Sequence, residues 1–187
     1  MTALETEIKI ELSDPRSVIQ KLRENGAVFL GAAKEKTIRI DTKNCDLEEK
    51  GLFLRVRGGF SNTITLKEKV GEDTTTRNRL ETEFEIEDID NMIYIFKRIG
   101  FDFIRELDKY RTMWSFQQVS IVIDELPFGI YMEIEGNEDQ IKAVKQELDL
   151  MSESSVIETY WEINEKKNPN NSSIIFPQDY NLKLINM

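Results

Sequence analysis

The chain has no histidine and only one cysteine, Cys45, among its 187 residues. Without an imidazole, Ser-His and Cys-His nucleophilic catalysis are excluded, so any reaction has to use carboxylates, cations, tyrosine, lysine or a bound metal. One cysteine cannot form an internal disulfide or a thiolate metal cluster, and the usual zinc ligands are missing. A metal site in this chain would therefore consist of oxygen ligands, which favour Mg²⁺ or Mn²⁺.

Long apolar runs and a net positive charge are also missing. No apolar run approaches the length of a membrane span, and the two acids near the start are unlike the basic and apolar stretch of a signal peptide. The 25 basic and 35 acidic residues give a net charge of −10, which opposes general binding to nucleic acid or to an anionic membrane. We expect a cytoplasmic protein of one domain, since 187 residues leave little room for a second core.

What the chain does contain is charge on every second residue of several short stretches. The first reads Glu5-x-Glu7-x-Lys9, with mostly apolar residues between the charges. Because strand side chains alternate between two faces, these three charges share one face. Two carboxylates and an ammonium suit a divalent cation together with the phosphate that it carries. An amphipathic strand with a solvated polar face has the same pattern, so the stretch alone leaves both interpretations open.

The same alternation recurs along the chain, with the two signs of charge largely on separate strands. If the apolar faces pack outward against helices, the charged faces line the lumen of a closed barrel, and a barrel of about eight strands can hold one small ligand. A buried cluster of this kind needs a ligand, a metal or mutual pairing to compensate its charges. The alternating charges are Arg55, Arg57, Lys67, Lys69, Arg79, Glu81, Glu83, Glu85, Lys109, Arg111, Glu133 and Glu135.

Three segments have helical spacing and eight read as strands. The sequence Ser13-Asp14-Pro15 can cap a helix that ends near Gly26, and further helices are expected over about 90–100 and 137–148. These elements predict an α+β fold with one curved antiparallel sheet or barrel. The predicted strands are 4–12, 34–42, 52–58, 62–70, 77–87, 102–114, 117–124 and 129–135.

Six short motifs of this chain resemble those of one protein family in their order and spacing. They are Glu5-x-Glu7-x-Lys9, Leu54-Arg55-Val56-Arg57, Thr65-Leu66-Lys67, Arg79-x-Glu81-x-Glu83, Lys109-x-Arg111, and Asp124-Glu125-Leu126-Pro127-Phe128-Gly129 followed by Glu133-x-Glu135. Together they resemble the CYTH family, the triphosphate tunnel metalloenzymes. The resemblance implies an eight-stranded antiparallel β-barrel, the triphosphate tunnel, with helices packed outside. It assigns residues 1–165 to this domain and leaves 166–187 as a C-terminal tail.

The resemblance also implies roles for the charged residues. Basic residues of the family bind the phosphate chain, and arginine suits this because a guanidinium bridges two phosphate oxygens. The implied phosphate ligands are Lys9, Arg55, Arg57, Lys67, Lys69, Arg79, Lys109 and Arg111. The implied ligands of Mg²⁺ or Mn²⁺ are Glu5, Glu7, Glu81, Glu83, Asp124, Glu133 and Glu135. The implied catalytic residues are Glu7, Lys9, Arg57 and Lys109.

Three activities are compatible with these motifs. Our first hypothesis is metal-dependent hydrolysis of a phosphoanhydride in inorganic triphosphate or in an organic or nucleoside triphosphate. Class IV adenylate cyclases resemble the chain at the same motifs, but the proteobacterial ones carry a His-Phe segment that this chain lacks. The third hypothesis is a non-catalytic protein that binds polyphosphate or a nucleotide. The expected partner is in each case a small-molecule phosphate compound, and a homodimer, common in the family, stays open.

Two regions depart from the family pattern or lie outside it. Family members often have Asp and Tyr on the second strand, where this chain has Thr37 and Arg39, and it stays open whether Arg39 faces the lumen. The tail contains a loop-forming Asn-Pro-Asn-Asn-Ser-Ser stretch and the apolar run 174–176, which we expect to dock on the barrel or at a tunnel mouth. The aromatic residues Trp114, Phe116, Tyr131 and Trp161 are expected to pack rather than to stack on a ligand.

Overall fold

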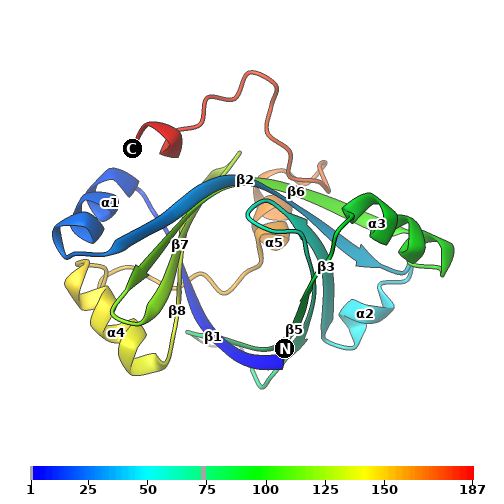
Figure 1. Cartoon of the computed structure of the whole chain (residues 1–187), viewed down its shortest axis with the longest axis horizontal. Coiled ribbons are helices and arrows are strands. Elements are labelled where there is room, and N and C mark those ends of the chain that lie inside the picture. The colour runs from blue at the N-terminus through cyan, green and yellow to red at the C-terminus, as the bar shows by residue number, and fades with distance from the viewer. Residues whose placement is uncertain (1, 73–74) are drawn as a thin grey trace.

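The computed structural model describes residues 2–72 and 75–187, which form a closed antiparallel barrel of eight strands (Figure 1). The order around the barrel is β1-β5-β4-β3-β2-β6-β7-β8. The strands are β1 (Thr2–Glu11), β2 (Val28–Asp41), β3 (Leu52–Gly58), β4 (Thr63–Lys69), β5 (Arg77–Glu85), β6 (Phe103–Phe116), β7 (Val119–Leu126) and β8 (Gly129–Glu135). The helices are α1 (Pro15–Glu24), α2 (Asp46–Glu49), α3 (Ile89–Arg98), α4 (Glu138–Glu147), α5 (Tyr160–Lys167) and the 3₁₀ turn η1 (Leu184–Asn186). The predicted fold is confirmed.

The strand β2 is longer than the sequence predicted. It begins at Val28 rather than at residue 34, because its first half is an apolar run without the alternation that marks a half-buried strand. This first half pairs with the far end of β6, where Val28 lies opposite Ser115. The register shifts between Phe29 and Gly31, and Gly31 has a φ of 146°. Side chains are strained at that φ, and a Cβ there would lie 3.0 Å from the Phe60 ring, so glycine permits the bulge.

The helices α1 and α3 begin at aspartate caps. The side chain of Asp14 accepts a hydrogen bond from the backbone N–H of Ser17, and Pro15 follows it in the first turn, as the sequence predicted. The helix α3 is capped by Asp88, whose carboxylate accepts from Asn91 N, so it begins slightly earlier than expected. The buried residues of α1 are Val18, Ile19 and Leu22.

The helices α4 and α5 each begin with a capping box, which joins Asn137 to Gln140 and Thr159 to Glu162. The sequence predicted α4 but not α5, because α5 has only eight residues and its buried face includes the polar Asn164, so its helical period is too short to recognise. The Thr-x-x-Glu spacing was the available signal for its start. Across the described residues, no helix combines the length and the apolar character that crossing a membrane requires.

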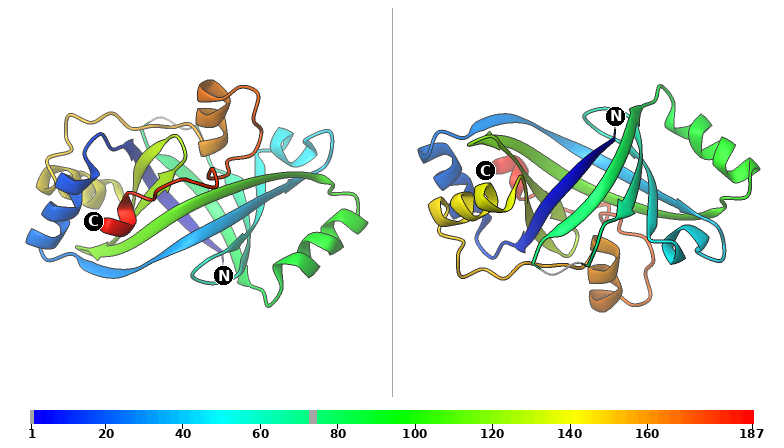
Figure 2. Two further views of the ribbon diagram at one scale, coloured as in Figure 1. Left: turned by 90° about the horizontal axis from the view of Figure 1, so that it is seen from above. Right: turned by 90° about the horizontal axis from the view of Figure 1, so that it is seen from below.

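The apolar faces of the strands point outward and pack under the helices. Figure 2 shows α1 (blue) and α4 (yellow) side by side at one end of the barrel and α3 (green) at the other. One core cluster joins α1 and α4 to β1, β6, β7 and β8, and another joins α3 to β2 and β3. Ile10 and Ile134 lie fully buried in the first cluster, whereas the adjacent Lys9 and Glu133 line the lumen. The expectation that charged faces point inward is confirmed.

The C-terminal tail runs over the outside of β6 and β7. Ile174 forms a parallel bridge with Leu107, and the fully buried carboxylate of Glu125 accepts hydrogen bonds from Tyr180 Oη at 3.1 Å and Lys183 N at 2.8 Å. A buried carboxylate needs such donors, so Glu125 fixes the tail to the barrel. The division of the chain at residue 165 stays a prediction.

Candidate active site in the barrel lumen

A cavity of about 820 Å³ occupies the lumen. Side chains from every strand of the barrel line it, together with the segment 157–162 that leads into α5. Of the residues predicted for the site, those that line the cavity are Glu5, Glu7, Lys9, Arg55, Arg57, Lys67, Lys69, Arg79, Glu81, Glu83, Lys109, Arg111, Glu133 and Glu135. Asp124 instead lies fully buried in the wall.

Glu5, Glu7 and Glu135, on β1 and β8, are called the carboxylate group here. Glu7 and Glu135 are opposite each other in the β1–β8 ladder, and Glu5 lies two residues away on the same face of β1. Burial and the nearby Glu133 raise the pKa of Glu7. Partial burial at the rim, together with Glu5 and Glu7, raises the pKa of Glu135. Carboxylates that lie this close together form a site that a cation stabilises.

Arg55, Arg57 and Lys67, on β3 and β4, are called the cation group here. Burial and the neighbouring Arg55 lower the pKa of both Arg57 and Lys67. Arg57 Nη2 lies 3.5 Å from Glu83 Oε2, and Lys67 Nζ lies 2.7 Å from Glu5 Oε2. The cation group therefore contacts the carboxylate group through Lys67 and Glu5. The positive charges within the cation group repel one another, so a bound anion would stabilise them.

The strand β5 adds residues of both signs beside these groups. Glu81 forms an ion pair with Lys67, and Arg77 Nη1 lies 3.1 Å from Glu7 Oε1. Arg77 lines the cavity although it was not predicted as a site residue, because the motif on this strand was recognised only from residue 79 onward. The alternation Arg-x-Arg-x-Glu-x-Glu was the signal that could have found it.

Asp124 is the centre of a buried network on β6 and β7. Arg111 Nε and Nη2 each donate to its carboxylate at 2.6 Å, and Lys109 Nζ and Tyr160 Oη donate at 3.0 Å. Burial alone would raise the pKa of Asp124, but Arg111 and Lys109 hold it below its usual value. In this structure the Asp124 oxygens accept hydrogen bonds from these donors. The metal-ligand role for Asp124 stays a prediction.

Lys9 and Glu133 lie opposite each other on β1 and β8. Lys9 Nζ lies 3.7 Å from Glu133 Oε1, donates to the backbone oxygen of Glu158 at 2.9 Å and sits 4.3 Å from the centre of the Tyr160 ring. Burial lowers the pKa of Lys9. Burial would raise the pKa of Glu133, but Lys9 and Arg111 hold it far below its usual range. Glu133 is thus ionised and acts as a fixed counter-charge for the cations around it.

The strand β2 contributes three cavity-lining residues that the sequence did not assign to the site: Glu35, Thr37 and Arg39. Glu35 Oε2 lies 3.3 Å from Lys109 Nζ and 3.5 Å from Arg111 Nε. Lysines flank Glu35 in the sequence, so charge falls on both faces of the strand and conceals the inward row. The structure settles the open question about Arg39, which faces the lumen.

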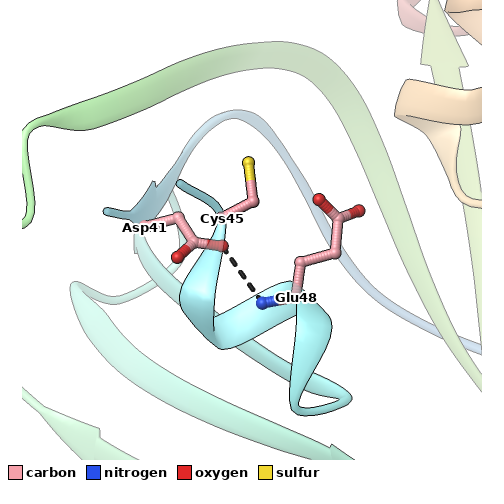
Figure 3. Close-up of side chains that lie close together, drawn as sticks. All are labelled: Asp41, Cys45 and Glu48. Atoms are coloured by element: carbon pink, nitrogen blue, oxygen red, sulfur yellow. Dashed lines mark hydrogen bonds between the residues drawn. The ribbon is translucent and has the colours of Figure 1, made fainter. Parts of the chain in front are cut away.

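Asp41, Cys45 and Glu48 form a small cluster at the start of α2 (Figure 3). Their ligand-type atoms all lie within 4.8 Å of one another. The Asp41 carboxylate, however, accepts three backbone N–H groups at 2.7 to 3.2 Å. Arg39 Nη2 lies 2.9 Å from Glu48 Oε2 and 3.6 Å from Asp41 Oδ2. The cluster thus fixes the first turn of α2 and the position of Arg39, and we assign no metal to it.

The fold and the lumen together define an antiparallel tunnel protein, in which acids and bases converge inside a closed barrel. Residues 3–160 match the CYTH domain, and the chain belongs to the CYTH family. A protein of Methanocaldococcus jannaschii named "Putative adenylate cyclase MJ0240" is 26% identical over 151 residues, which are 80% of this chain and 86% of that protein.

Solved structures share the fold. A Pyrococcus horikoshii protein of 26% identity has a TM-score of 0.68, covering 88% of this chain and 99% of that one. A Pyrococcus furiosus protein of 23% identity has a TM-score of 0.72, with 84% and 98% covered. A Hippeastrum protein of 15% identity has a TM-score of 0.64, with 95% and 100% covered, and is described as having a dominant triphosphatase activity.

Proposed function

We propose that the protein is a divalent-metal-dependent enzyme that binds a triphosphate in the lumen and hydrolyses a phosphoanhydride bond. One observation carries this proposal: the carboxylate group and the cation group meet in one cavity at the Lys67–Glu5 pair, 2.7 Å apart. Like charges lie close together in each group: besides burial, Glu5 and Glu7 raise the pKa of Glu135, and Arg55 lowers the pKa of Arg57 and Lys67. A triphosphate with its bound divalent cation carries both complementary charges and would stabilise both groups at once.

The donor set of the carboxylate group fits Mg²⁺ or Mn²⁺, which prefer oxygen ligands. Glu5, Glu7 and Glu135 are the ligands that we favour, because they lie together on the paired strands β1 and β8 and all line the cavity. The ion would supply Lewis-acid polarisation of the phosphate oxygens. The further predicted metal ligands are Glu81, Glu83, Asp124 and Glu133.

The cations of the lumen would hold the phosphate chain and stabilise the developing charge. Arg55 and Arg57 can each bridge two phosphate oxygens, and Lys67 adds a point charge beside them. Lys9 and Lys109 lie on the Tyr160 ring, with Nζ atoms 4.3 and 5.8 Å from its centre. Cations fixed in this way neutralise the leaving phosphate without reorganisation, which lowers the barrier to attack by water. Lys69, Arg79 and Arg111 complete the proposed phosphate ligands.

Metal affinity is expected to fall as the pH is lowered from about 7.5 to about 4.5, the ordinary pKa of a glutamate, since the carboxylates must be deprotonated to bind. The sign follows from the raised pKa values of Glu7 and Glu135, which make both side chains take up protons at a higher pH than a free glutamate does. Calorimetric titration with Mn²⁺ in buffers of different ionisation enthalpy would measure both the affinity and the protons released. An affinity that stays constant over this range, with no proton release, would contradict the assignment.

Cyclisation of ATP to cyclic AMP and pyrophosphate is the second candidate, and the name of the M. jannaschii relative favours it. The description of the Hippeastrum protein favours hydrolysis. Incubation with inorganic triphosphate, ATP and thiamine triphosphate, with Mg²⁺ or Mn²⁺, distinguishes them when phosphate, pyrophosphate and cyclic AMP are all measured. We expect metal-dependent phosphate release. Formation of cyclic AMP and pyrophosphate would show that the activity is cyclisation and not hydrolysis. Metal-dependent binding without any product would indicate a binding protein.

A further inference from the structure

Thr65 lies on the lumen face of β4, between two charged residues of the proposed site. Its Cα is paired with that of Arg55 on β3 and with that of Glu83 on β5. Residues that are directly opposite in an antiparallel ladder share one face, so all three side chains are on the lumen face. Thr65 is 0% exposed, whereas Arg55 and Glu83 line the cavity. Thr65 therefore lies behind the two charged side chains and would not contact a ligand.

The Thr65 hydroxyl is hydrogen-bonded to both of these neighbours. Its Oγ1 atom accepts from Arg55 Nε at 3.3 Å and donates to Glu83 Oε2 at 2.7 Å. The same Glu83 oxygen lies 3.5 Å from Arg57 Nη2. One hydroxyl and one carboxylate oxygen thus link the two arginines of the cation group to each other.

The two arginines need such a link because their charges repel each other. Arg55 and Arg57 are two residues apart on one face of β3, and burial, followed by the nearby Arg55, lowers the pKa of Arg57. An arginine side chain has many rotamers, and repulsion favours those that move the two guanidinium groups apart. The bond to Thr65 orders Arg55 through Nε, so that the Nη1–Nη2 edge can bridge two phosphate oxygens.

Thr63 is a second threonine on the same face of β4, and its hydroxyl is not bonded in this way. It lies two residues before Thr65, opposite Arg57, and is 3% exposed. Its Oγ1 atom has no hydrogen-bond partner among residues 2–72 and 75–187. A buried hydroxyl on this face is therefore not bonded to the charged residues merely by being there, and the two bonds of Thr65 depend on its position.

We propose that Thr65 is a positioning residue, whose hydroxyl fixes the two arginines of the cation group for binding one phosphate chain. It acts on Arg55 directly and on Arg57 through Glu83. The proposal rests on the proposed function, because that function places phosphate on these arginines. It adds a neutral residue that does not contact the ligand to the residues that determine triphosphate affinity.

Thr65→Val removes the hydroxyl and keeps the branched shape of the side chain. The ligand is an inorganic triphosphate analogue with methylene groups in place of the bridging oxygens, which prevents hydrolysis, and it is titrated calorimetrically with Mg²⁺. We expect Thr65→Val to bind it about 10-fold more weakly than the wild type, the size of effect of losing a hydrogen bond to a charged group. Thr65→Ala should show the same loss and replaces Thr65→Val if valine prevents folding.

Two variants keep this result specific to the hydroxyl. Thr65→Ser restores a hydroxyl at the same position and should bind the analogue within about 3-fold of the wild type, since only a methyl group is lost. Thr63→Val is the matched control, because it makes the same chemical change two residues away, where the hydroxyl has no described partner. It should bind within about 2-fold of the wild type, since no hydrogen bond is lost.

A double-mutant cycle separates positioning from a general structural effect. If Thr65 acts through Arg55, the effect of Thr65→Val should shrink to about 3-fold or less in a protein that already carries Arg55→Met. A general loss of structure would instead weaken binding by the same factor in both backgrounds. Thermal unfolding of each variant shows that the proteins compared are folded at the temperature of the titration.

The outcomes separate this inference from the proposed function. If the analogue binds to the wild type and to Thr65→Val equally, or if Thr65→Ser is as weak as Thr65→Val, the positioning role is refuted while the triphosphate tunnel stands. An undiminished effect of Thr65→Val in the Arg55→Met background also refutes it. If the analogue does not bind to the wild-type protein, the proposed function itself fails, and this inference fails with it.

Discussion

Replacement of Glu7 by glutamine is expected to lower kcat for triphosphate hydrolysis by at least about 10²-fold, the size of effect found when one electrostatic contact to a transition state is removed. Glu7 is buried between Glu5 and Glu135 and loses its charge in this variant while keeping its shape. The measurement is the rate of phosphate release at saturating Mg²⁺ and substrate.

Two comparisons keep this result specific. Glu11→Gln is the matched control, because Glu11 lies on the same strand but outside the cavity, where Lys167 and Tyr131 donate hydrogen bonds to it. The Glu11→Gln variant should leave the rate unchanged.

The pKa of Glu7 is raised in the folded protein, so its ionised form costs stability at neutral pH. Metal-free Glu7→Gln is therefore expected to unfold at the same temperature as the wild type or higher. An unchanged rate in Glu7→Gln would refute its catalytic role.

Replacement of Asp124 by alanine is expected to have the largest effect on stability, about 3–5 kcal/mol, since breaking a buried ion pair leaves charges uncompensated. Asp124 is 0% exposed and accepts hydrogen bonds from Arg111, Lys109 and Tyr160. Its lowered pKa gives the same sign: the stabilisation is present at neutral pH and is lost as the pH falls through the folded-state pKa. For a chain of this size the loss corresponds to a melting temperature lower by about 6–20 °C.

The control for this prediction is Asp102→Ala. Asp102 also has a lysine partner, Lys43 at 2.9 Å, but both side chains are exposed and screened by solvent, so Asp102→Ala should change the melting temperature little. Thermal unfolding of the metal-free proteins provides the comparison. If Asp124 served only as a metal ligand, removing its charge would not destabilise the metal-free protein, and an unchanged melting temperature would contradict the network described above.

The barrel was predictable because its strands follow one simple rule. Apolar residues that pack under helices alternate with charges that face the lumen, and the resulting period of two marks most of the strands. The rule fails at the first half of β2, where residues 28–33 are apolar on both faces. It also gives no information on α5, which is a helix of only eight residues and has the polar Asn164 on its buried face.

The site was predictable as a set of residues and less so as an arrangement. The resemblance named most of the residues that line the cavity, but it could not show that Asp124 is enclosed by Arg111 and Lys109. Glu35 and Arg39 were left out because lysines on the outer face of β2 hide the inward row. Pairings of this kind depend on the register between strands far apart in sequence, which a local pattern does not contain.

The most direct test of the tunnel is to count Mn²⁺ ions bound by the wild-type protein and by Glu7→Gln, from the electron paramagnetic resonance signal of free Mn²⁺, with and without inorganic triphosphate. The tunnel predicts that triphosphate tightens Mn²⁺ binding in the wild type, because the carboxylate group and the cation group are then satisfied together. It also predicts that Glu7→Gln loses this tightening. Equal Mn²⁺ binding by the two proteins in the presence of triphosphate would contradict the account.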